Sequence, residues 1–457
     1  MMESNADLLI RNAKIWIAEG QSGFLSEVSV AVGNGRILEV GKPQNLEASY
    51  PATKTWDAKG KLLLPGLLNT HCHLFQTFMR GLGKDLPFMD WMNSSVRLLM
   101  PMMDDEAVYL AAMVGCMEAI RTGTTTLVDF MYANVKPRLS DAVLRAFDEC
   151  GIRGMLARGF TDIDHFPGSP TPPASWQRVE DTLADIERLQ ALYKGHPRIG
   201  FILAPSVIWA MTREGLAETA RYAKANDLVL TMHLLETADD DQFSQERYGK
   251  RTTRVLEEIG VLETHFLAVH TVRLQEEDIR LFEQYHTKIS HNPVANMILG
   301  SGAAPICELA RRGIQISLGT DGAASNDSQN MIEVMKSAAL LQKVHYRDTA
   351  ALSARQVFSM ATDQGAATIK MEDQIGALLP GMRADILVVD LEKPNTTPCY
   401  DPIASLVYSG SEANISSVFV EGSLVLENGV LTRVDEEDIL RRAQKKAQDL
   451  HQAAKIK

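Results

Sequence analysis

The chain has 457 residues, of which 45% are hydrophobic and 23% are charged, which is the balance of an ordinary globular protein. Its 58 acidic residues outnumber its 46 Lys and Arg residues, for a formal net charge of −12, and no basic cluster stands out, so we expect no nucleic-acid partner. The first residues lack the basic and apolar segments of a signal peptide, and no apolar run reaches membrane-spanning length, so we expect a cytoplasmic protein that binds no membrane.

The cysteines are widely scattered along the chain: Cys72, Cys116, Cys150, Cys307 and Cys399. None of them forms a C-x-x-C pair, so the sequence suggests neither a disulfide framework nor a zinc knuckle. This cysteine usage agrees with the cytoplasm as the expected compartment.

The two ends of the chain contain short apolar segments separated by glycine-containing turns. They lie at 8–13, 28–32 and 36–40 near the start and at 384–390, 417–422 and 424–429 near the end. Because isolated hairpins are only marginally stable, we expect both ends to combine into one β-sandwich domain, formed by residues 1–64 and 375–457. A charged helix is expected from Asp435 onward.

Between these ends, short apolar strands alternate with amphipathic helical segments. The expected strands are 62–71, 124–131, 152–160, 199–205, 228–235, 266–271, 287–291 and 314–320. The expected helices are 104–122, 137–150, 177–193, 213–226, 275–285, 303–312, 328–343 and 354–368. Strict alternation predicts a parallel sheet, and eight units predict an α/β protein with a closed (β/α)8 TIM barrel over residues 65–374. An open doubly wound sheet is the competing architecture, but no G-x-G-x-x-G follows an early strand. The proline-rich segment 167–173 is expected to be a loop.

The first of these strands ends in two histidines, His71 and His73. Residues i and i+2 of an extended strand point to the same face, so two imidazoles lie side by side at the end of a buried strand. Imidazole is a common metal ligand, and barrel enzymes keep their chemistry at strand ends. An isolated H-x-H pair is more often part of a turn, but other strands of this chain supply further ligands.

Three more strands end in residues that can bind a metal: His233, His270 and Asp321. All would converge on the C-terminal mouth of one barrel. A single histidine after a strand is usually structural, whereas five such residues favour a metal site. Imidazoles with one carboxylate suit Zn²⁺ or Fe²⁺ better than Mg²⁺ or Ca²⁺.

Glu236 lies three residues after His233, just beyond the strand. A water molecule held by such a metal loses its proton near neutral pH, and a carboxylate at this place can carry a proton from water to a leaving group. The alternative is a carboxylate at a helix N-terminus, but its position beside a ligand favours catalysis.

These motifs together resemble the amidohydrolase superfamily. Within it, they resemble most the branch of S-adenosylhomocysteine/methylthioadenosine deaminases and triazine hydrolases, such as atrazine chlorohydrolase and melamine deaminase. The resemblance covers nearly the whole chain. It is carried by segments 64–66, 71–73, 80–81, 123–126, 290–293, 319–326 and 376–385.

The resemblance implies one divalent metal, most simply Zn²⁺ with Fe²⁺ as the alternative, bound by His71, His73, His233 and Asp321. It also implies that His270 ligates the metal or orients the attacking water, that Glu236 is the proton shuttle, and that Asp321 can accept a proton. Relatives with two metals use a lysine near the fourth strand, and segment 200–205 contains none, so a single metal is expected.

Two candidate substrate contacts lie near the first strand. Gln76 falls where triazine hydrolases also carry a glutamine, and its amide could pair with ring nitrogens. Trp91 lies in an expected lid loop and could stack on a planar ring, or else it anchors the core.

Four further candidates lie later in the chain. Arg158 and Arg178 resemble positions where nucleoside-type members carry arginines, although either could be a surface residue. His291 and Asn292 follow the seventh strand and could contact a ring heteroatom.

The chain also departs from its relatives. Nucleoside deaminases carry an acidic residue where Met103 stands and a histidine where Ser206 stands, so a more apolar pocket is expected. The residues between Asp321 and Asn326 differ from those of triazine hydrolases.

We therefore predict a metal-dependent aminohydrolase that deaminates an amino-substituted nitrogen heterocycle of purine, pterin, pyrimidine or triazine type. The alternatives are a triazine hydrolase that releases chloride or alkylamine, a deaminase of adenosine derivatives, and a catalytically silent barrel scaffold. Small zinc deaminases of nucleic acids need H-x-E with P-C-x-x-C, which this chain lacks. The expected partner is a small heterocyclic substrate, and the resemblance suggests a homodimer.

Overall fold

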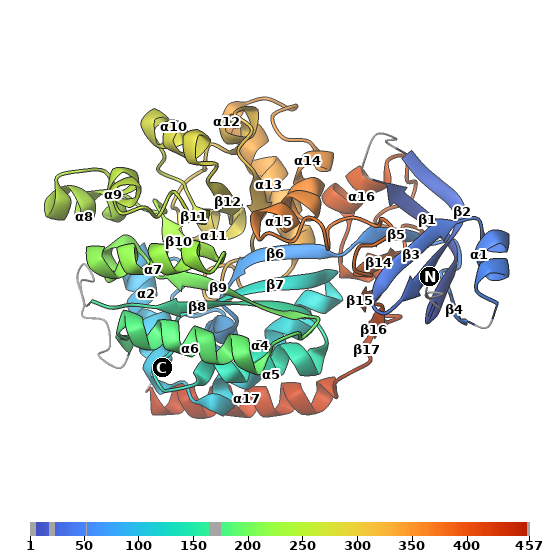
Figure 1. Ribbon diagram of the computed structural model, residues 1–457, viewed down its shortest axis with the longest axis horizontal. Coiled ribbons are helices and arrows are strands. Elements are labelled where there is room, and N and C mark those ends of the chain that lie inside the picture. The colour runs from blue at the N-terminus through green and yellow to red at the C-terminus, as the bar shows by residue number, and fades with distance from the viewer. Residues whose placement is uncertain (1–5, 18–22, 52, 164–174, 455–457) are drawn as a thin grey trace.

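The computed structural model describes residues 6–17, 23–51, 53–163 and 175–454, and at its centre a parallel β-sheet forms a barrel (Figure 1). Its eight strands lie side by side in chain order. They are β6 (Leu67–Cys72), β7 (Thr124–Met131), β8 (Arg153–Phe160), β9 (Ile199–Pro205), β10 (Val229–Leu234), β11 (His265–His270), β12 (Lys288–His291) and β13 (Ile316–Leu318). The predicted barrel is confirmed. The proline-rich segment 167–173 lies outside the described residues.

Polar contacts link the last strand of the barrel to the first. Oγ of Ser317 lies 2.7 Å from Oγ1 of Thr70, and the backbone N–H of Asp321 donates to the carbonyl of His71 at 2.9 Å. The strands are buried along nearly their whole length because helices and loops cover both faces of the parallel sheet. These contacts place the loops that follow β13 directly beside the end of β6.

The predicted first strand, 62–71, is wrong in one respect: it is two strands in two different sheets. Residues Leu62–Pro65 form β5 in the terminal sheet, and the chain passes into β6 at Gly66. A side chain at Gly66 could not fit, since a Cβ there would lie 2.0 Å from Oγ1 of Thr125. The apolar run is continuous because both strands are buried, so hydrophobicity alone does not reveal the break.

Helices cover the outside of the barrel at nearly all the predicted places. Those that match predicted segments are α4 (Asp105–Arg121), α5 (Leu139–Cys150), α6 (Val179–Leu192), α7 (Arg213–Ala225), α10 (Glu276–Tyr285), α12 (Ile306–Arg311) and α13 (Met331–Tyr346). Helices that the periodicity did not reveal include α2 (Phe88–Ser94), α8 (Asp239–Tyr248), α9 (Thr252–Glu258) and α11 (Pro293–Ile298). Three of them have only six or seven residues, and α8, although ten residues long, is polar on nearly all sides, so apolar periodicity does not reveal them.

The predicted helix 354–368 is also divided. It consists of α14 (Ala354–Met360) and α15 (Asp363–Thr368), with Thr362 in a non-helical conformation between them. The carbonyl of Ala361 accepts a hydrogen bond from the backbone N–H of Leu68 in β6 at 2.8 Å. The break therefore anchors these helices to the first strand of the barrel.

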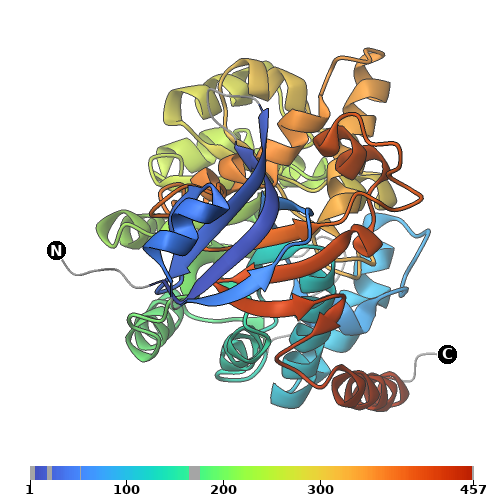
Figure 2. The ribbon, with the colours of Figure 1, turned by 90° about the vertical axis from the view of Figure 1, so that its right-hand side faces the viewer.

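The strands from both chain ends combine, as predicted, and they form a second, mixed sheet. Its members are β1 (Leu8–Ile17), β2 (Gly23–Gly33), β3 (Arg36–Gly41), β4 (Lys54–Asp57), β5, β14 (Ile386–Val389), β15 (Ile415–Val420), β16 (Ser423–Glu427) and β17 (Val430–Leu431). Strand β5 pairs antiparallel with β14, which brings the N-terminal and C-terminal strands together (Figure 2). The exact division into residues 1–64 plus 375–457 and 65–374 stays a prediction.

A buried ion-pair cluster joins this sheet to the bottom of the barrel. Arg153, at the start of β8, donates from Nε and one terminal nitrogen to the two carboxylate oxygens of Asp385 at 2.9 and 3.0 Å, and it also donates to Glu421 at 2.6 Å.

The predicted C-terminal helix is α17 (Glu436–Ala453), which lies beneath the barrel in Figure 1. Its Lys446 bonds Asp104 at the N-terminus of α4 at 2.8 Å.

No helix within the described residues is long and apolar enough to span a lipid bilayer.

Candidate metal centre and active site

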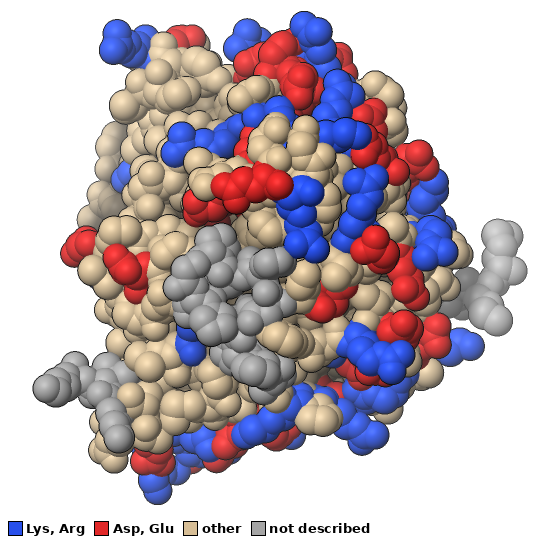
Figure 3. Space-filling model, turned by 90° about the vertical axis from the view of Figure 1, so that its left-hand side faces the viewer, with Lys and Arg blue, Asp and Glu red and all other residues tan. Residues whose placement is uncertain are grey.

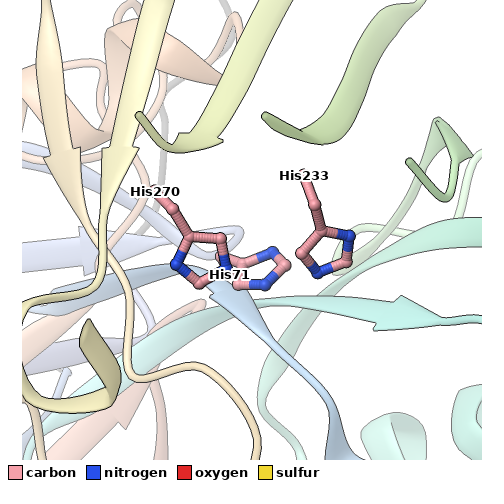
Figure 4. A group of neighbouring side chains, drawn as sticks. All are labelled: His71, His233 and His270. Atoms are coloured by element: carbon pink, nitrogen blue, oxygen red, sulfur yellow. The ribbon is translucent and has the colours of Figure 1, made fainter. Parts of the chain in front are cut away.

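Four histidines and one aspartate meet at the carboxyl ends of the barrel strands. They are His71 in β6, His73 just beyond it, His233 in β10, His270 at the end of β11 and Asp321 shortly after β13. Figure 4 shows the imidazoles of His71, His233 and His270 gathered together, and their candidate ligand atoms lie within 4.8 Å of one another. A second such group contains His71, His73 and Asp321.

The distances between these atoms fit a shared metal ion. Nε2 of His73 lies 3.2 Å from Nε2 of His233 and 3.3 Å from Oδ1 of Asp321. Nε2 of His71 lies 3.5 Å from the same oxygen. Ligands about 2.1 Å from a tetrahedral zinc ion lie about 3.4 Å apart, so the spacing matches what such an ion requires.

Backbone carbonyls orient two of the imidazoles. Nδ1 of His73 lies 2.7 Å from the carbonyl oxygen of Phe130, and Nδ1 of His233 lies 2.9 Å from that of Ser206. Because a carbonyl only accepts, the proton sits on Nδ1 and the lone pair of Nε2 faces the centre. Burial lowers the pKa of His73 to about 3 and that of His233 well below its usual value, so both rings are neutral ligands at neutral pH.

His71 provides the strongest sign of a missing partner. Its side chain is fully buried, and neither ring nitrogen has a hydrogen-bond partner among the described residues. Buried polar groups of native proteins are nearly always satisfied. Burial alone would raise the pKa of Asp321, but the imidazoles of His71, His73 and His270 close to its carboxylate together hold that pKa below its usual range. The residues present thus fit a divalent cation bound by nitrogen and oxygen.

A buried polar network holds Asp321 in place, and sequence reasoning missed it. Asp321 has a left-handed backbone conformation, with φ of 65°, and its carbonyl accepts from the side-chain amide of Gln329 at 3.2 Å. The hydroxyl of Thr320 donates to Gln329 at 2.9 Å and accepts from the amide of Asn69 at 2.7 Å. Asn69 lies two residues before His71, on the same side of the strand, which is the one signal the sequence offered.

Glu236 and His270 lie next to each other in the pocket lining. Oε2 of Glu236 lies 3.6 Å from Nε2 of His270, and the hydroxyl of Ser301 donates to Oε1 of Glu236 at 3.3 Å. Burial raises the pKa of Glu236, which favours a carboxyl group able to give and take a proton. Nδ1 of His270 lies 3.0 Å from Oδ1 of Asn296. Neither Ser301 nor Asn296 was predicted, because both lie in the segment around α11.

His73, His233, His270 and Asp321 line a pocket with about 950 Å³ of empty space, part of which is open to solvent. Its walls are largely apolar and aromatic, with Phe88, Trp91 and Trp209 among the lining residues. A concave, mostly apolar pocket with a few convergent polar groups is typical of sites for small planar ligands. The pocket therefore suits a heterocycle better than an extended polar substrate.

Two of the predicted substrate contacts, Gln76 and Trp91, do line this pocket. Gln76 belongs to a short 3₁₀ helix after β6, and its amide nitrogen donates to the hydroxyl of Tyr132 at 2.8 Å. Trp91 lies on α2, and its indole N–H donates to the carbonyl of Ala324 at 2.9 Å. Their roles toward a substrate stay predictions.

The predicted arginines do not line the pocket. Arg158, at the end of β8, is buried and bonds the side chains of Asp185 and Gln177 at 2.9 and 2.8 Å. Arg178 precedes α6, and its side chain is 73% exposed. The structure thus gives Arg158 partners within the barrel wall and leaves Arg178 at the surface.

His291 and Asn292, at the end of β12, are fully buried and do not line the pocket. Neither ring nitrogen of His291 has a hydrogen-bond partner among the described residues. A Cβ at Gly319 would lie 2.3 Å from Oδ1 of Asn292, so this amide packs against the β13 segment. A contact of either residue with substrate stays a prediction.

Met103 and Ser206, the two positions at which the chain departs from nucleoside deaminases, lie in different parts of the structure. Met103 is fully buried and packs in the core rather than in the pocket wall. Ser206 does line the pocket, and its carbonyl is the acceptor that orients His233. Trp209, three residues after Ser206, also lines the pocket, and its indole N–H donates to Oδ1 of Asp240 at 3.0 Å.

The surface on this side of the molecule carries charges of both signs. Figure 3 shows the side on which α8 and α9 lie, with Lys and Arg side chains intermixed with Asp and Glu. No extended basic face of the kind that tracks a phosphate backbone is visible among the described residues of this view.

Comparison with known proteins agrees with the geometry of the site. Residues 62–425 match the model of the Amidohydrolase family. The chain belongs to this family. It is therefore a metal-dependent hydrolase of carbon–nitrogen bonds in cyclic amidines, and the resemblance expected from its motifs is confirmed.

Several relatives match over nearly their full length. The chain is 33% identical over 449 residues to a 5′-deoxyadenosine deaminase of Methanosarcina mazei, covering 97% of this chain and 98% of that protein. It is 32% identical over 444 residues to a 5-methylthioadenosine/S-adenosylhomocysteine deaminase of Syntrophomonas wolfei, covering 97% and 99%.

Solved structures show the same fold. A zinc-bound adenosine deaminase from Xanthomonas campestris superposes with a TM-score of 0.90 at 26% identity, covering 98% of this chain and 99% of that one. A zinc-complexed atrazine chlorohydrolase from Arthrobacter aurescens superposes with a TM-score of 0.89 at 25% identity, covering 96% and 100%.

Proposed function

We propose that this amidohydrolase deaminates adenosine-type nucleosides with a single zinc ion bound by His71, His73, His233 and Asp321. The observation that carries the proposal is the orphaned imidazole of His71 inside a cluster spaced for one metal. Full-length similarity to 5′-deoxyadenosine and 5-methylthioadenosine deaminases supports the adenosine class, and two zinc-bound neighbours support zinc over iron. A homodimer and a cytoplasmic location remain predictions from the sequence.

The reaction replaces an amino group by an oxygen. When bound, a divalent metal here supplies a water molecule of lowered pKa as the nucleophile. Glu236 gives a proton to the ring nitrogen next to the reacting carbon, which makes that carbon more electrophilic. It then passes the second water proton to the exocyclic nitrogen, so that this nitrogen leaves as ammonia while the carbon keeps a carbonyl oxygen.

His270 contributes to this reaction by orienting the attacking water. Its Nδ1 proton is directed at Asn296, so Nε2 offers a lone pair toward Glu236 and the centre of the cluster. A lone pair there can accept a hydrogen bond from water and hold it for attack. The apolar walls exclude other water and leave room for a planar base.

One specific observation favours a second candidate, a triazine-type hydrolase. Met103 lies in the core where nucleoside deaminases carry an acidic residue, and the atrazine chlorohydrolase superposes nearly as well as the adenosine deaminase. Both candidates use the same centre and Glu236, so the site chemistry alone does not separate them.

A substrate panel tests the proposal. Purified enzyme loaded with zinc would be given adenosine, 5′-deoxyadenosine, 5′-methylthioadenosine and S-adenosylhomocysteine, with atrazine and melamine in parallel. Release of ammonia with conversion to the hypoxanthine-type product supports the proposal. Turnover of the triazines alone would establish the second candidate instead, and Glu236→Gln serves as the inactive control.

A further inference from the structure

The hydroxyl of Tyr132 lies in the pocket and donates no hydrogen bond to any described residue. Tyr132 directly follows β7 and lines the pocket beside Gln76. Its oxygen accepts a hydrogen bond from Nε2 of Gln76 at 2.8 Å, and no described residue accepts the hydroxyl hydrogen. A phenolic hydrogen stays near the ring plane and has two directions there. Because the amide of Gln76 lies in one of these two directions, the hydroxyl hydrogen points in the other. No described residue accepts it there.

The ring of Tyr132 is held firmly enough for this hydrogen to have a defined place. It packs edge-to-face against His73 and Phe75, with ring centroids 4.9 Å apart in both pairs. Gly159 makes room for it, since a Cβ there would lie 2.8 Å from both Cα and Cβ of Tyr132. The residue is therefore packed from its backbone to its ring.

Gln76 is fixed as well. Its side chain is buried, and a Cβ at Gly322 would lie 1.8 Å from its Oε1. A glycine directly after Asp321 thus lets the amide reach across the first and last strands of the barrel. The amide positions the hydroxyl of Tyr132, and the two side chains form one hydrogen-bonding unit.

This unit and Glu236 lie on different sides of the ligand cluster. Tyr132 packs against His73 at the end of β6, whereas Glu236 lies 3.6 Å from His270 at the end of β11. A planar base whose reacting carbon faces the cluster would present one edge to Glu236 and the opposite edge to Tyr132. The two groups could therefore each form a hydrogen bond with a different edge of the same ring.

We propose that Tyr132 is a specificity-determining residue whose hydroxyl donates a hydrogen bond to N7 of the adenine ring. The proposal rests on the adenosine-type function proposed above. In adenine the reacting carbon, C6, lies between N1 and C5, and C5 carries N7. With N1 facing Glu236, the acceptor on the other edge is N7, which stays an acceptor in the product as well.

The expected effect follows from the cost of an unpaired donor. A ring with CH in place of N7 leaves the hydroxyl without an acceptor, and removing the hydroxyl leaves N7 without a donor. Either loss costs about tenfold in kcat/KM, and losing both together costs no more than losing one.

The test combines one enzyme variant with one substrate analogue. Wild type and Tyr132→Phe are assayed with adenosine, 7-deazaadenosine and 3-deazaadenosine. We expect Tyr132→Phe to lower kcat/KM about tenfold on adenosine and on 3-deazaadenosine, but to leave it unchanged on 7-deazaadenosine. Tyr109→Phe is the matched control, since that hydroxyl bonds Glu149 at 2.5 Å on the outside of the barrel.

The outcomes separate this inference from the function on which it rests. An equal loss on adenosine and 7-deazaadenosine, or no loss on either, overturns the contact with N7. A loss that disappears with 3-deazaadenosine instead assigns the hydroxyl to another ring atom and also overturns it. A wild type inactive on adenosine-type substrates overturns the proposed function and this contact together. Zinc content and thermal unfolding of Tyr132→Phe equal to wild type show that only the hydroxyl was removed.

Discussion

Oδ1 of Asn296 lies 3.0 Å from Nδ1 of His270. An amide oxygen only accepts, so it keeps the proton on Nδ1 and leaves Nε2 of the neutral ring free to accept. His270 has a left-handed backbone, with φ of 71°, which turns the ring back toward the cluster at the end of its strand. Asn296 therefore determines both the tautomer and the direction of this imidazole.

Replacing Asn296 by Ala should lower kcat about 10- to 100-fold while most of the metal stays bound. The ring of His270 would lose its tautomer preference, although the four proposed metal ligands would remain in place. Steady-state kinetics with metal analysis would measure this. Asn296→Asp is the informative second variant, because a carboxylate oxygen can still accept from Nδ1 of His270 and should therefore retain most of the kcat that Asn296→Ala loses. A wild-type kcat in Asn296→Ala would contradict the assignment.

The sequence allowed us to predict that the metal-binding residues lie close together, but not which residues orient them or line the site beside them. His71 and His233 lie near the ends of buried strands and Asp321 shortly after one, and the geometry of parallel barrels brings such ends together. Asn296 and Tyr132 reach the site from a helix and a loop, where no periodicity reports which way a side chain points. Their roles depend on packing between segments far apart in the chain, and a single sequence does not reveal that packing.

Removing a metal ligand should abolish both metal binding and turnover. His71→Ala or Asp321→Ala leaves three of the four proposed ligands, and each residue that binds the metal contributes both to its affinity and to the activation of water. We expect little zinc after gel filtration and no deamination, with thermal unfolding close to that of the metal-free wild type. Arg178→Ala is the matched surface control, since that side chain is 73% exposed. Full zinc content together with activity in either ligand variant would refute the site.

Glu236→Gln should separate proton transfer from metal binding. The amide keeps the size of the carboxylate and can still bond Ser301, but it cannot shuttle a proton. We expect zinc content near that of wild type, retained substrate binding and a kcat at least about a hundredfold lower. Loss of the metal would instead make Glu236 a ligand. An intact kcat would move the proton shuttle to His270 and Asp321.

The cluster around Arg153 should control stability rather than chemistry. Arg153 is buried between the barrel and the terminal sheet, and Arg153→Met leaves Asp385 without its partner while Glu421 keeps its ion pair with Arg383. Breaking a buried pair on one side costs about 3–5 kcal/mol. Chemical denaturation should show this loss, and the kcat of the folded fraction should match wild type. A loss below about 1 kcal/mol would mean that water reaches the vacated site.

Asp240 should make stability depend on pH in the direction opposite to an ordinary ion pair. Burial raises its pKa from 3.8 to about 7, against the opposing hydrogen bonds from the backbone of Leu235 and the indole of Trp209. Between about pH 4 and pH 7 the folded protein keeps the proton that the unfolded chain gives up, so this residue's contribution to stability falls as pH rises. Its slope is at most about 1.4 kcal/mol per pH unit, and it ends above the folded pKa.

Asp240→Asn has no group to titrate there, so the variant should gain stability relative to wild type as pH rises from about 5 to about 8. Unfolding midpoints of both proteins across this range measure the difference, which cancels the titration of all other groups. The amide still accepts one of the two hydrogen bonds, so a constant offset is expected as well. An offset that does not change with pH would show that Asp240 stays ionised in the folded protein, stabilised by the N–H groups of Leu235 and Trp209.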